Sequence, residues 1–416
     1  MTAVSATPST LRSVLVPAVV VGALGYFVDI YDLILFSIVR VPSLKDLGLS
    51  GSDLTDKGLF LINMQMAGML LGGILWGVLG DRRGRVVLLF GSICLYSAAN
   101  IANGLVQSVE AYAIWRFIAG VGLAGELGGS ITLVSEVLPK ESRGYGTMIV
   151  ATVGVFGAVV AALIAARFSW RVSYFIGGGL GFALLLLRYG VLESGMFRKV
   201  QTAPEDGIAR GNFLSLFTNG RRFFKYLCCI LIGLPTWYVV GILVTFSPEF
   251  ARALDVQGEI SAGTAVMLCY LGITLGDFFS GSGSQWVRSR RKVVAAFLIA
   301  ALVVIAIYFR ARGASVEGFY AIIFCLGFTM GYWAVFVTIG AEQFGTNLRA
   351  TVATTVPNFA RGSLPLIALS FAKAKETGLG LLGGGLVVGV ICIVIALVAL
   401  AGLEETYGKD LDYVER

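Results

Sequence analysis

The stretch Gly77-Val-Leu-Gly-Asp81-Arg82-Arg83-Gly84-Arg85 decides the fold of this 416-residue chain. It follows an almost uninterrupted apolar run from Gly58 to Trp76, and a second apolar run comes directly after it. A short basic turn between two apolar segments fits a membrane surface, where arginine side chains reach water and lipid phosphate. The stretch therefore predicts two membrane-spanning helices joined by a tight turn.

A weaker copy of this stretch returns as Gly281-Ser-Gly-Ser-Gln285-Trp-Val-Arg288-Ser-Arg290-Arg291-Lys292, at an offset of 281 − 77 = 204 residues. A second motif, Glu136 followed by Arg143, recurs as Glu342 followed by Arg349, at an offset of 342 − 136 = 206. Because the two offsets agree, we expect an internal duplication into two similar halves. The alternative is a chance similarity of two loops.

The composition places the whole chain in a membrane. Hydrophobic residues make up 57% of the sequence and charged residues only 14%, with a mean hydropathy of +0.84. A soluble protein carries about a quarter charged residues, and runs of about 20 apolar residues are typical of spanning helices. We predict an all-α membrane protein of twelve transmembrane helices in two six-helix pseudo-symmetric halves. The expected parts are a first half at 1–192, a cytoplasmic linker at 193–222, a second half at 223–402 and a tail at 403–416.

Charge placement predicts the orientation. The net charge is +7, and Lys and Arg are about twice as frequent in the loops on the side of the termini as in those on the other side. We therefore expect both termini in the cytoplasm, a cell-membrane location, and no nucleic-acid partner. The six cysteines lie in apolar runs without metal-ligand spacing, so no metal, cofactor or catalytic site is predicted.

Six ionisable residues fall inside the predicted spans, where a charge is costly and usually faces a polar cavity. They are Asp29, Asp32, Arg116, Glu126, Asp277 and Arg361. We expect them to surround a central polar cavity.

The acidic members are candidates for proton coupling. Asp29 and Asp32 share one helix face, so one of them should hold a proton unless a cation is near. Glu126 lies among glycines and is either a proton carrier or a carboxylate bonded to the backbone or a hydroxyl. Asp277 either couples protons or caps a bend at Gly281. The chain has no histidine, so a proton must ride on a carboxylate.

Arg361 is the candidate substrate-binding residue, because it lies between Pro357 and Pro365 in a helix that the prolines should bend. A guanidinium binds a carboxylate or phosphate through two parallel hydrogen bonds. The alternative is a structural pair with Asp277 or Glu126. Other side chains expected at the same cavity are Asn358, Tyr31, Trp237, Tyr238 and Trp333.

These features resemble the major facilitator superfamily over essentially the whole chain. The resemblance is closest to its metabolite:proton symporters, with kinship to sugar porters and organic-ion transporters. It is carried by Asp29-Ile-Tyr-Asp32, Arg116-Phe-Ile-Ala-Gly120, Gly125-Glu126-Leu-Gly128-Gly129, Glu136…Pro139…Arg143-Gly144, Trp170-Arg171, Glu193-Ser194 and Glu405-Thr406-Tyr407. The family usually has Glu at position 29, Trp at position 127 and Asp at position 285.

The resemblance implies two sets of charge contacts. Asp32 would pair with Arg116, either for coupling or as a permanent structural bridge. The lock that joins the halves when the site opens outward would comprise Gly77, Asp81, Arg82, Arg85, Glu136, Arg143, Glu342 and Arg349. Phosphate anchoring is the alternative for the arginines, and it does not explain Asp81.

The function predicted is secondary active transport of a small organic anion by alternating access, in symport with protons. The protein should work as a monomer with the substrate, protons and the bilayer as its partners. One alternative is a transporter that imports or exports a cationic or zwitterionic solute. The acidic residues of the first and fourth helices would then supply the counter-charge. The other is a receptor or channel, which would have no need of a duplicated charge lock.

Overall fold

The computed structural model describes residues 15–50, 53–139, 142–193, 211–409 and 413–414. Within them, 11 helical segments are long and apolar enough to cross a membrane. The last one, Arg349–Ala401, turns back at Gly378 (φ 87°) and Gly380 (φ 64°), so it supplies two crossings and the total is twelve. The chain is a multi-pass membrane protein, as the apolar runs predicted.

The first half contains seven helices that make six crossings. They are α2 (Pro17–Asp46), α3 (Asp53–Arg83), α4 (Arg85–Leu105), α5 (Val109–Leu123), α6 (Glu126–Val137), α7 (Arg143–Ala165) and α8 (Trp170–Glu193). The turn between α3 and α4 passes through Gly84 at φ 94°, a backbone conformation that favours glycine.

The second half follows the short helix α9 (Ser215–Thr218). Its elements are α10 (Gly220–Leu231), α11 (Leu234–Tyr238), the π-helical stretch η2 (Val239–Val244), α12 (Ser247–Ala253), α13 (Ala262–Trp286), α14 (Arg290–Arg310), α15 (Val316–Met330), α16 (Trp333–Gln343), α17 (Arg349–Gly362), α18 (Leu364–Ala374), the π-helical turn η3 (Lys375–Leu379) and α19 (Gly380–Ala401). The α10 helix begins three residues before the predicted boundary at 223.

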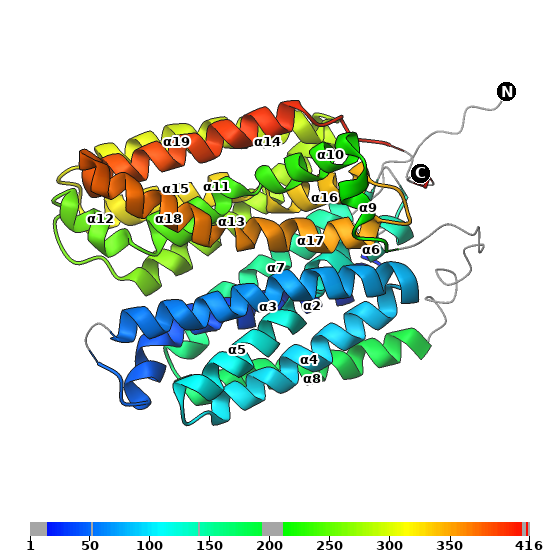
Figure 1. Cartoon of the computed structure of the whole chain (residues 1–416), viewed down its shortest axis with the longest axis horizontal. Coiled ribbons are helices and arrows are strands. Elements are labelled where there is room, and N and C mark those ends of the chain that lie inside the picture. Colours follow the sequence, from blue (N-terminus) through cyan, green and yellow to red (C-terminus); the bar gives the residue numbers. More distant parts are fainter. Residues whose placement is uncertain (1–14, 51–52, 140–141, 194–210, 410–412, 415–416) are drawn as a thin grey trace.

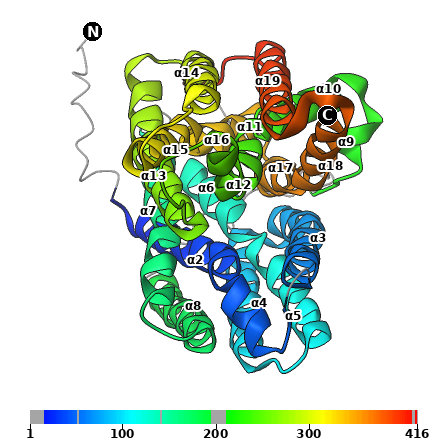
Figure 2. The ribbon, with the colours of Figure 1, turned by 90° about the vertical axis from the view of Figure 1, so that its left-hand side faces the viewer.

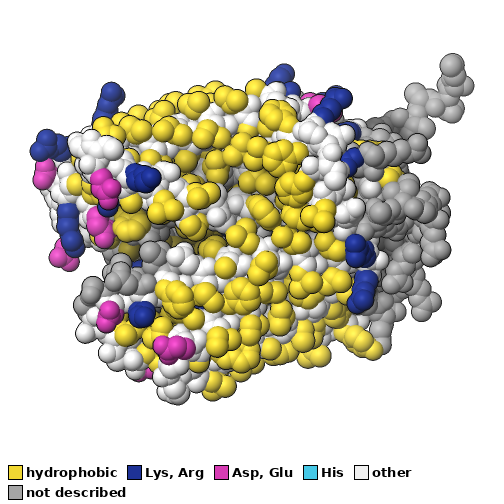
Figure 3. Space-filling view, viewed as in Figure 1, with side chains coloured by type: hydrophobic (Ala, Val, Ile, Leu, Met, Phe, Trp, Pro, Cys, Tyr) yellow, Lys and Arg dark blue, Asp and Glu magenta, His cyan; other side chains and the backbone are white. Residues whose placement is uncertain are grey.

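The two halves lie one above the other in Figure 1, with the blue-to-cyan helices below and the green-to-red helices above. Figure 2 shows the same two bundles end on. We call the side where α2 begins and α19 ends the termini side, and the opposite side the far side. Apolar side chains cover the middle of the molecule in Figure 3, while the visible Lys, Arg, Asp and Glu side chains gather at its two ends.

Helices α3 and α17, and helices α7 and α13, form the main contacts between the halves. Glycine allows this close approach, since a Cβ at Gly77 would lie 2.9 Å from Thr351 Cα. A Cβ at Gly281 would likewise collide with the Met148 side chain. Gly77, expected as a member of the charge lock, therefore allows the backbones of α3 and α17 to approach closely.

Several crossings are broken near mid-length, and the breaks position polar groups. One break separates α5 from α6 at Ala124, and an equivalent break separates α15 from α16 at Gly331. A third falls at Ser363, just before Pro365, which occupies the start of α18 where a missing N–H is tolerated. Pro357, expected to bend the same crossing, remains inside α17.

Candidate functional site

Arg361 lies between the two halves near the middle of the molecule, and its side chain is 2% exposed. Its Nη1 donates to Asn358 Oδ1 at 3.1 Å, and its guanidinium lies 5.7 Å from the centre of the Trp333 ring. Its Nε has no hydrogen-bond partner, and no described carboxylate forms an ion pair with it. The predicted structural pair with Asp277 or Glu126 is therefore not formed.

The other buried arginines show how unusual this is. Arg188, Arg290 and Arg349 are also 2% exposed, and each pairs with a glutamate. Arg116, fully buried, bonds to neutral oxygens instead. Among the five buried arginines, only Arg361 and Arg116 have no carboxylate partner in the described part of the chain.

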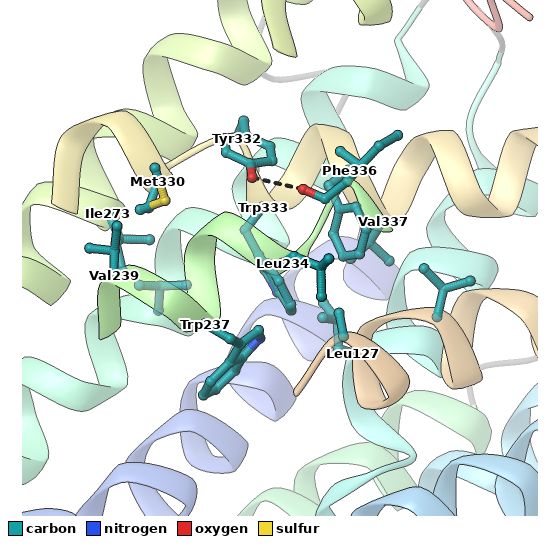
Figure 4. Close-up of a cluster of buried hydrophobic side chains, with 14 of the residues drawn as sticks. Leu127, Leu234, Trp237, Val239, Ile273, Met330, Tyr332, Trp333, Phe336 and Val337 are labelled. Atoms are coloured by element: carbon teal, nitrogen blue, oxygen red, sulfur yellow. Dashed lines mark hydrogen bonds between the residues drawn. The ribbon is translucent and has the colours of Figure 1, made fainter. Parts of the chain in front are cut away.

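An aromatic wall borders Arg361 on the side of the second half. Trp237 and Trp333 meet edge to face, with ring centroids 6.2 Å apart. Figure 4 shows Leu127 of the first half reaching into the same cluster as Leu234, Trp237 and Trp333. The indole Nε1 of Trp237 is buried without a described partner, so it is a donor still available to a ligand.

Asn358 orients Arg361 and also joins the halves. Its Nδ2 donates to Ala124 O at 2.9 Å, at the break between α5 and α6, and to Thr354 O at 2.7 Å. All of its described hydrogen-bonding atoms are therefore in use, and we assign it to positioning.

Two predicted cavity residues lie elsewhere. Tyr31 donates to Ser173 O on α8 at 2.9 Å, and Tyr238 donates to Gly385 O on α19 at 2.5 Å. Each side chain packs inside its own half, because the rotation of its helix turns it away from the interface. Tyr26, one turn before Asp29, is another aromatic residue expected at the cavity, and the charge of Arg361 acts on it.

Asp29 and Asp32 are both fully buried, and none of their four carboxylate oxygens has a described hydrogen bond of normal length. The charges of Arg361 and Glu126 act on Asp29, and Asp32 is influenced by Asp29, by Arg116 and by the neighbouring Asn100 amide. Two unpaired carboxylates one turn apart cannot both be charged cheaply in this environment. Their placement is what a proton-binding pair requires.

The ion pair that the resemblance implied between Asp32 and Arg116 is absent from the described residues. Arg116 instead donates to Gln65 Oε1 and to Tyr174 Oη (3.4 Å), and its guanidinium lies 4.8 Å from the centre of the Phe36 ring. These neutral partners occupy the guanidinium, so Arg116 and Asp32 do not form an ion pair among the described residues. Gln65, a polar residue in an apolar run, was missed by the sequence analysis.

Glu126 is paired inside the first half. Arg188 of α8 holds it through two hydrogen bonds, Nη1 to Oε1 at 3.0 Å and Nη2 to Oε2 at 2.8 Å, and Ser92 adds a third at 3.0 Å. Both charged side chains are at most 2% exposed. The sequence analysis left Arg188 without a role, although an arginine inside a predicted span was the available signal.

Asp277 has a capping role, but not at the predicted bend. Its Oδ1 accepts from Ala334 N at 2.9 Å, in the first turn of α16, where the crossing is broken. A carboxylate at a helix N-terminus satisfies an otherwise unpaired N–H. The helix containing Gly281 continues unbroken to Trp286.

The predicted central cavity is not open in this structure. The six ionisable residues expected around it are all between 0% and 2% exposed. Their side chains are therefore buried inside the protein and have almost no contact with bulk solvent.

The lock residues lie at the termini side. Asp81, 5% exposed, accepts from Ala350 N at 3.1 Å, Thr351 N at 2.8 Å and Thr351 Oγ1 at 2.6 Å. It therefore caps the start of α17 in the opposite half, where a negative charge is also favoured by the helix dipole. Glu136 and Arg349 form a second contact between the halves at 3.7 Å.

The second copy of the motif behaves differently. Gln285, the counterpart of Asp81, accepts from Gly144 N at 3.2 Å and from Arg290 Nη1 at 3.1 Å when its amide oxygen faces them. It thus meets the start of α7 as Asp81 meets the start of α17, but without a charge. Glu342, expected in the lock, pairs with Arg290 of its own half at 3.4 Å.

The positions of the remaining lock residues are as follows, as far as the structure describes them. Arg82 is exposed at the end of α3, and Arg143 is half-buried at the start of α7. The side chain of Arg85 is outside the described residues. Glu405, beyond α19, is held by Ser289 and by Arg290 N (2.9 Å); burial alone raises a carboxyl pKa, but these hydrogen bonds outweigh it and lower the pKa of Glu405.

We expect Asp81→Asn to open the termini side. The change removes the charge that caps α17, and a charged hydrogen bond is worth about 1.5–3 kcal/mol, or roughly ten- to a hundredfold in a two-state equilibrium. The measurement is thiol labelling from the termini side of a single cysteine, Thr354→Cys, in a chain whose native cysteines are replaced. The exposed Glu404→Gln change at the same side is the control. Equal labelling in both variants, with transport unchanged, would show that Asp81 does not hold the closure.

Comparisons with known proteins agree with this architecture. Residues 22–368 match the family model of the Major Facilitator Superfamily. The chain is 26% identical over 420 residues to a protein named as a metabolite transport protein in Haemophilus influenzae, covering 95% of this chain and 97% of the relative. It is 31% identical over 163 residues to the niacin transporter of Acinetobacter baylyi, covering 38% of this chain and 36% of the relative. It is 26% identical over 228 residues to a proline/betaine transporter of Staphylococcus aureus, covering 49% of this chain and 47% of the relative.

The structure of the proton:xylose symporter XylE with bound 6-bromo-6-deoxy-D-glucose superimposes with a TM-score of 0.73 at 17% identity, over 95% of this chain and 97% of the symporter. This likeness shows the fold. Together with the family match over most of the chain, it establishes that the protein belongs to the major facilitator superfamily and is a small-molecule transporter of the membrane, not an enzyme.

Proposed function

We propose that this protein carries a small organic anion with a carboxylate group, in symport with protons, by alternating access. The carrying observation is Arg361, which is buried between the halves with a neutral partner and with no carboxylate partner among the described residues. A buried guanidinium without a counter-charge is costly, and a substrate carboxylate would supply two charged hydrogen bonds. The termini side is the cytoplasmic side in this proposal, and the protein acts as a monomer.

The aromatic wall points to a flat or ring-bearing anion. Trp333 lies against the guanidinium, and Trp237 offers an unpaired indole N–H beside it. A carboxylate bonded to Arg361 would place the rest of a small substrate against these rings. The name of one relative supports this choice, because niacin is an aromatic carboxylic acid.

Proton coupling follows from the position of Asp29. The charge of Arg361 acts on Asp29, so a charged Asp29 and a substrate carboxylate would compete for one guanidinium. Protonation of Asp29 would release Arg361 to bind the substrate, and the two ligands would then favour the same closed form. Asp32, one turn away, can exchange the same proton.

A zwitterionic solute is the second candidate. Arg361 and Asp29 together present one positive and one negative group at the interface, which fits the carboxylate and the cationic nitrogen of an amino acid or betaine. One relative is named as a proline/betaine transporter. A zwitterionic substrate requires Asp29 to stay charged during transport. An organic anion requires Asp29 to gain and lose a proton in each transport cycle.

A thermal-shift experiment on the purified protein at pH 5.5 and 7.5 separates the candidates. Nicotinate is compared with nicotinamide, its uncharged amide, and with proline and glycine betaine. A ligand that binds the folded protein raises its apparent stability. Stabilisation by nicotinate alone supports the anion proposal, and stabilisation by proline or betaine alone supports the zwitterion. A response to nicotinamide equal to that to nicotinate would reject a carboxylate-binding role for Arg361.

The proton proposal predicts that Asp29→Asn or Asp32→Asn abolishes accumulation driven by a pH gradient but retains exchange of substrate across proteoliposomes. Exchange needs no net proton cycle, whereas accumulation does. Asp255→Asn is the control, because Asp255 is exposed beside Arg312 and its positive φ of 53° suits asparagine. If both variants still concentrate substrate against a gradient, the coupling carboxylate lies elsewhere.

A further inference from the structure

Helix α4 carries a line of polar residues that the site described above does not use. Ser97, Asn100 and Asn103 are spaced three residues apart, so they share one face of the helix, which we call the α4 polar face. All three are 0% exposed. Tyr96, next to Ser97, is also 0% exposed.

This face packs against glycines of α8, beside Asp32 of α2. A Cβ at Gly181 would collide with Ser97 Oγ, and a Cβ at Gly177 would collide with Asp32 Oδ1. Figure 1 shows α4 and α8 side by side in the lower bundle, consistent with their extensive contact. The glycines therefore keep room for polar groups of α4 and α2 in one layer inside the first half.

Most polar atoms of this layer have no hydrogen-bond partner among the described residues. Both amide atoms of Asn103, Ser97 Oγ and Tyr96 Oη are buried without a hydrogen bond. The Asn100 amide and the Asp32 carboxylate are neighbours that interact with each other, but they are not joined by a hydrogen bond of normal length. Leaving so many buried polar atoms unpaired would cost a free energy comparable to the whole stability of a typical domain. Water is the group of suitable size that can bond to several of them at once.

The layer leads from Asp32 toward the far side. Asn103 lies two residues before the end of α4 at Leu105, and six residues of helix separate it from Ser97, or about 9 Å. At its outer end, Arg171 Nη1 bonds to Gly104 O at 3.0 Å and to Val106 O at 2.8 Å. No group of the α4 polar face can ionise, so it can orient water but cannot hold a proton.

We propose that the α4 polar face binds a short chain of internal water that carries protons between the far side and Asp32, apart from the substrate path at Arg361. A proton would enter at the water beside Asn103, and a different proton would leave the innermost water for Asp32, so no water is consumed. The carboxylate becomes a neutral acid. The transfer of protons to Asp32 rests on the proposed proton symport. The binding of water at the α4 polar face does not depend on it.

The charged and titratable groups around Asp32 are compatible with this role. Asp29 and Arg116 are the nearest charges, and Tyr31, Tyr96 and Tyr174 are the nearest phenols. Arg116 favours the charged carboxylate and Asp29 the neutral one, so Asp32 has an opposing charge on each side.

Hydroxyl-radical footprinting of the full-length protein in nanodiscs tests the water-binding site. Tyrosines next to bound water are oxidised even when buried, and Tyr96 and Tyr308 are both 0% exposed. Tyr308 serves as the internal control, because its hydroxyl is bonded to Leu243 O at 3.0 Å. We expect Tyr96 to be oxidised several-fold faster than Tyr308. Equal protection of both tyrosines would overturn the proposal.

Variants then localise the water. Asn100→Leu should lower the oxidation of Tyr96 to the level of Tyr308, whereas Asn100→Ser, which is smaller and polar, should keep it high. Thr132→Val is the matched control in the same half, because Thr132 bonds to Gly128 O of its own helix at 2.7 Å. If Asn100→Leu does not fold, the comparison of Tyr96 with Tyr308 in the unchanged protein decides.

Proton transfer has its own measurement. The carboxylic C=O band of Asp32 is assigned by comparing infrared difference spectra with those of Asp32→Asn. In D2O this band shifts as the acid proton is exchanged for a deuteron. We expect this exchange to be many-fold slower in Asn100→Leu than in Asn100→Ser. Equal rates would reject the proton path and leave the hydrated site standing. If Tyr96 is hydrated but substrate transport does not depend on protons, the proposed symport would be overturned and the water-binding site would stand.

Discussion

Arg361→Ala is expected to abolish uptake of a carboxylate substrate without reducing the amount of folded protein. The loss of a charged hydrogen bond costs about 1.5–3 kcal/mol, so losing a two-pronged contact weakens binding by at least roughly ten- to a hundredfold. Folding should survive, because Arg361 has one neutral partner, Asn358, and no ion pair to break. Uptake into proteoliposomes and size-exclusion profiles in detergent measure the two effects.

Arg361→Lys is the diagnostic variant. It keeps the positive charge but cannot form two parallel hydrogen bonds to one carboxylate, so binding should fall nearly as far as in Arg361→Ala. The exposed Arg312→Ala change controls for the loss of an arginine. Normal uptake by Arg361→Ala would reject the anion proposal, and normal uptake by Arg361→Lys would reduce the role of Arg361 to its charge.

Arg188→Ala is expected to have the largest effect on stability. It leaves Glu126 as an unpaired carboxylate that is fully buried, and breaking a buried ion pair in this way costs about 3–5 kcal/mol. The variant should therefore lose much of its folded yield and unfold at a markedly lower temperature. Thermal unfolding in detergent, followed by size-exclusion fluorescence, measures the change.

Replacing both Glu126 and Arg188 by apolar residues tests whether the loss of stability comes from leaving one buried charge unpaired. The double variant Glu126→Leu with Arg188→Met should be more stable than Arg188→Ala, because no buried charge is left alone. It should also retain accumulation driven by a pH gradient, since Glu126 is bonded to Arg188 and Ser92 and is assigned to structure. Loss of accumulation in a folded double variant would return Glu126 to the coupling residues.

The sequence by itself determined the class of the molecule. Apolar runs of spanning length and a duplicated basic motif predicted twelve crossings in two halves, and the structure and the family match confirm the fold. These features are local, because hydropathy and turn chemistry act within one segment. The sequence also identified six of the charges at membrane depth, although it missed Arg188, since the cost of a charge is a property of the span that contains it.

Tertiary structure alone decided the partners. Asp81 meets the start of α17 some 270 residues away, and Glu126 is held by Arg188, which the sequence left without a role. The rotation of each helix turned Tyr31 and Tyr238 into their own halves and placed Tyr26 toward Arg361. The physical reason is that an apolar run fixes the existence of a spanning helix but not its rotation. Rotation is set by packing against other helices, so the partner of each buried charge is known only once the helices are assembled.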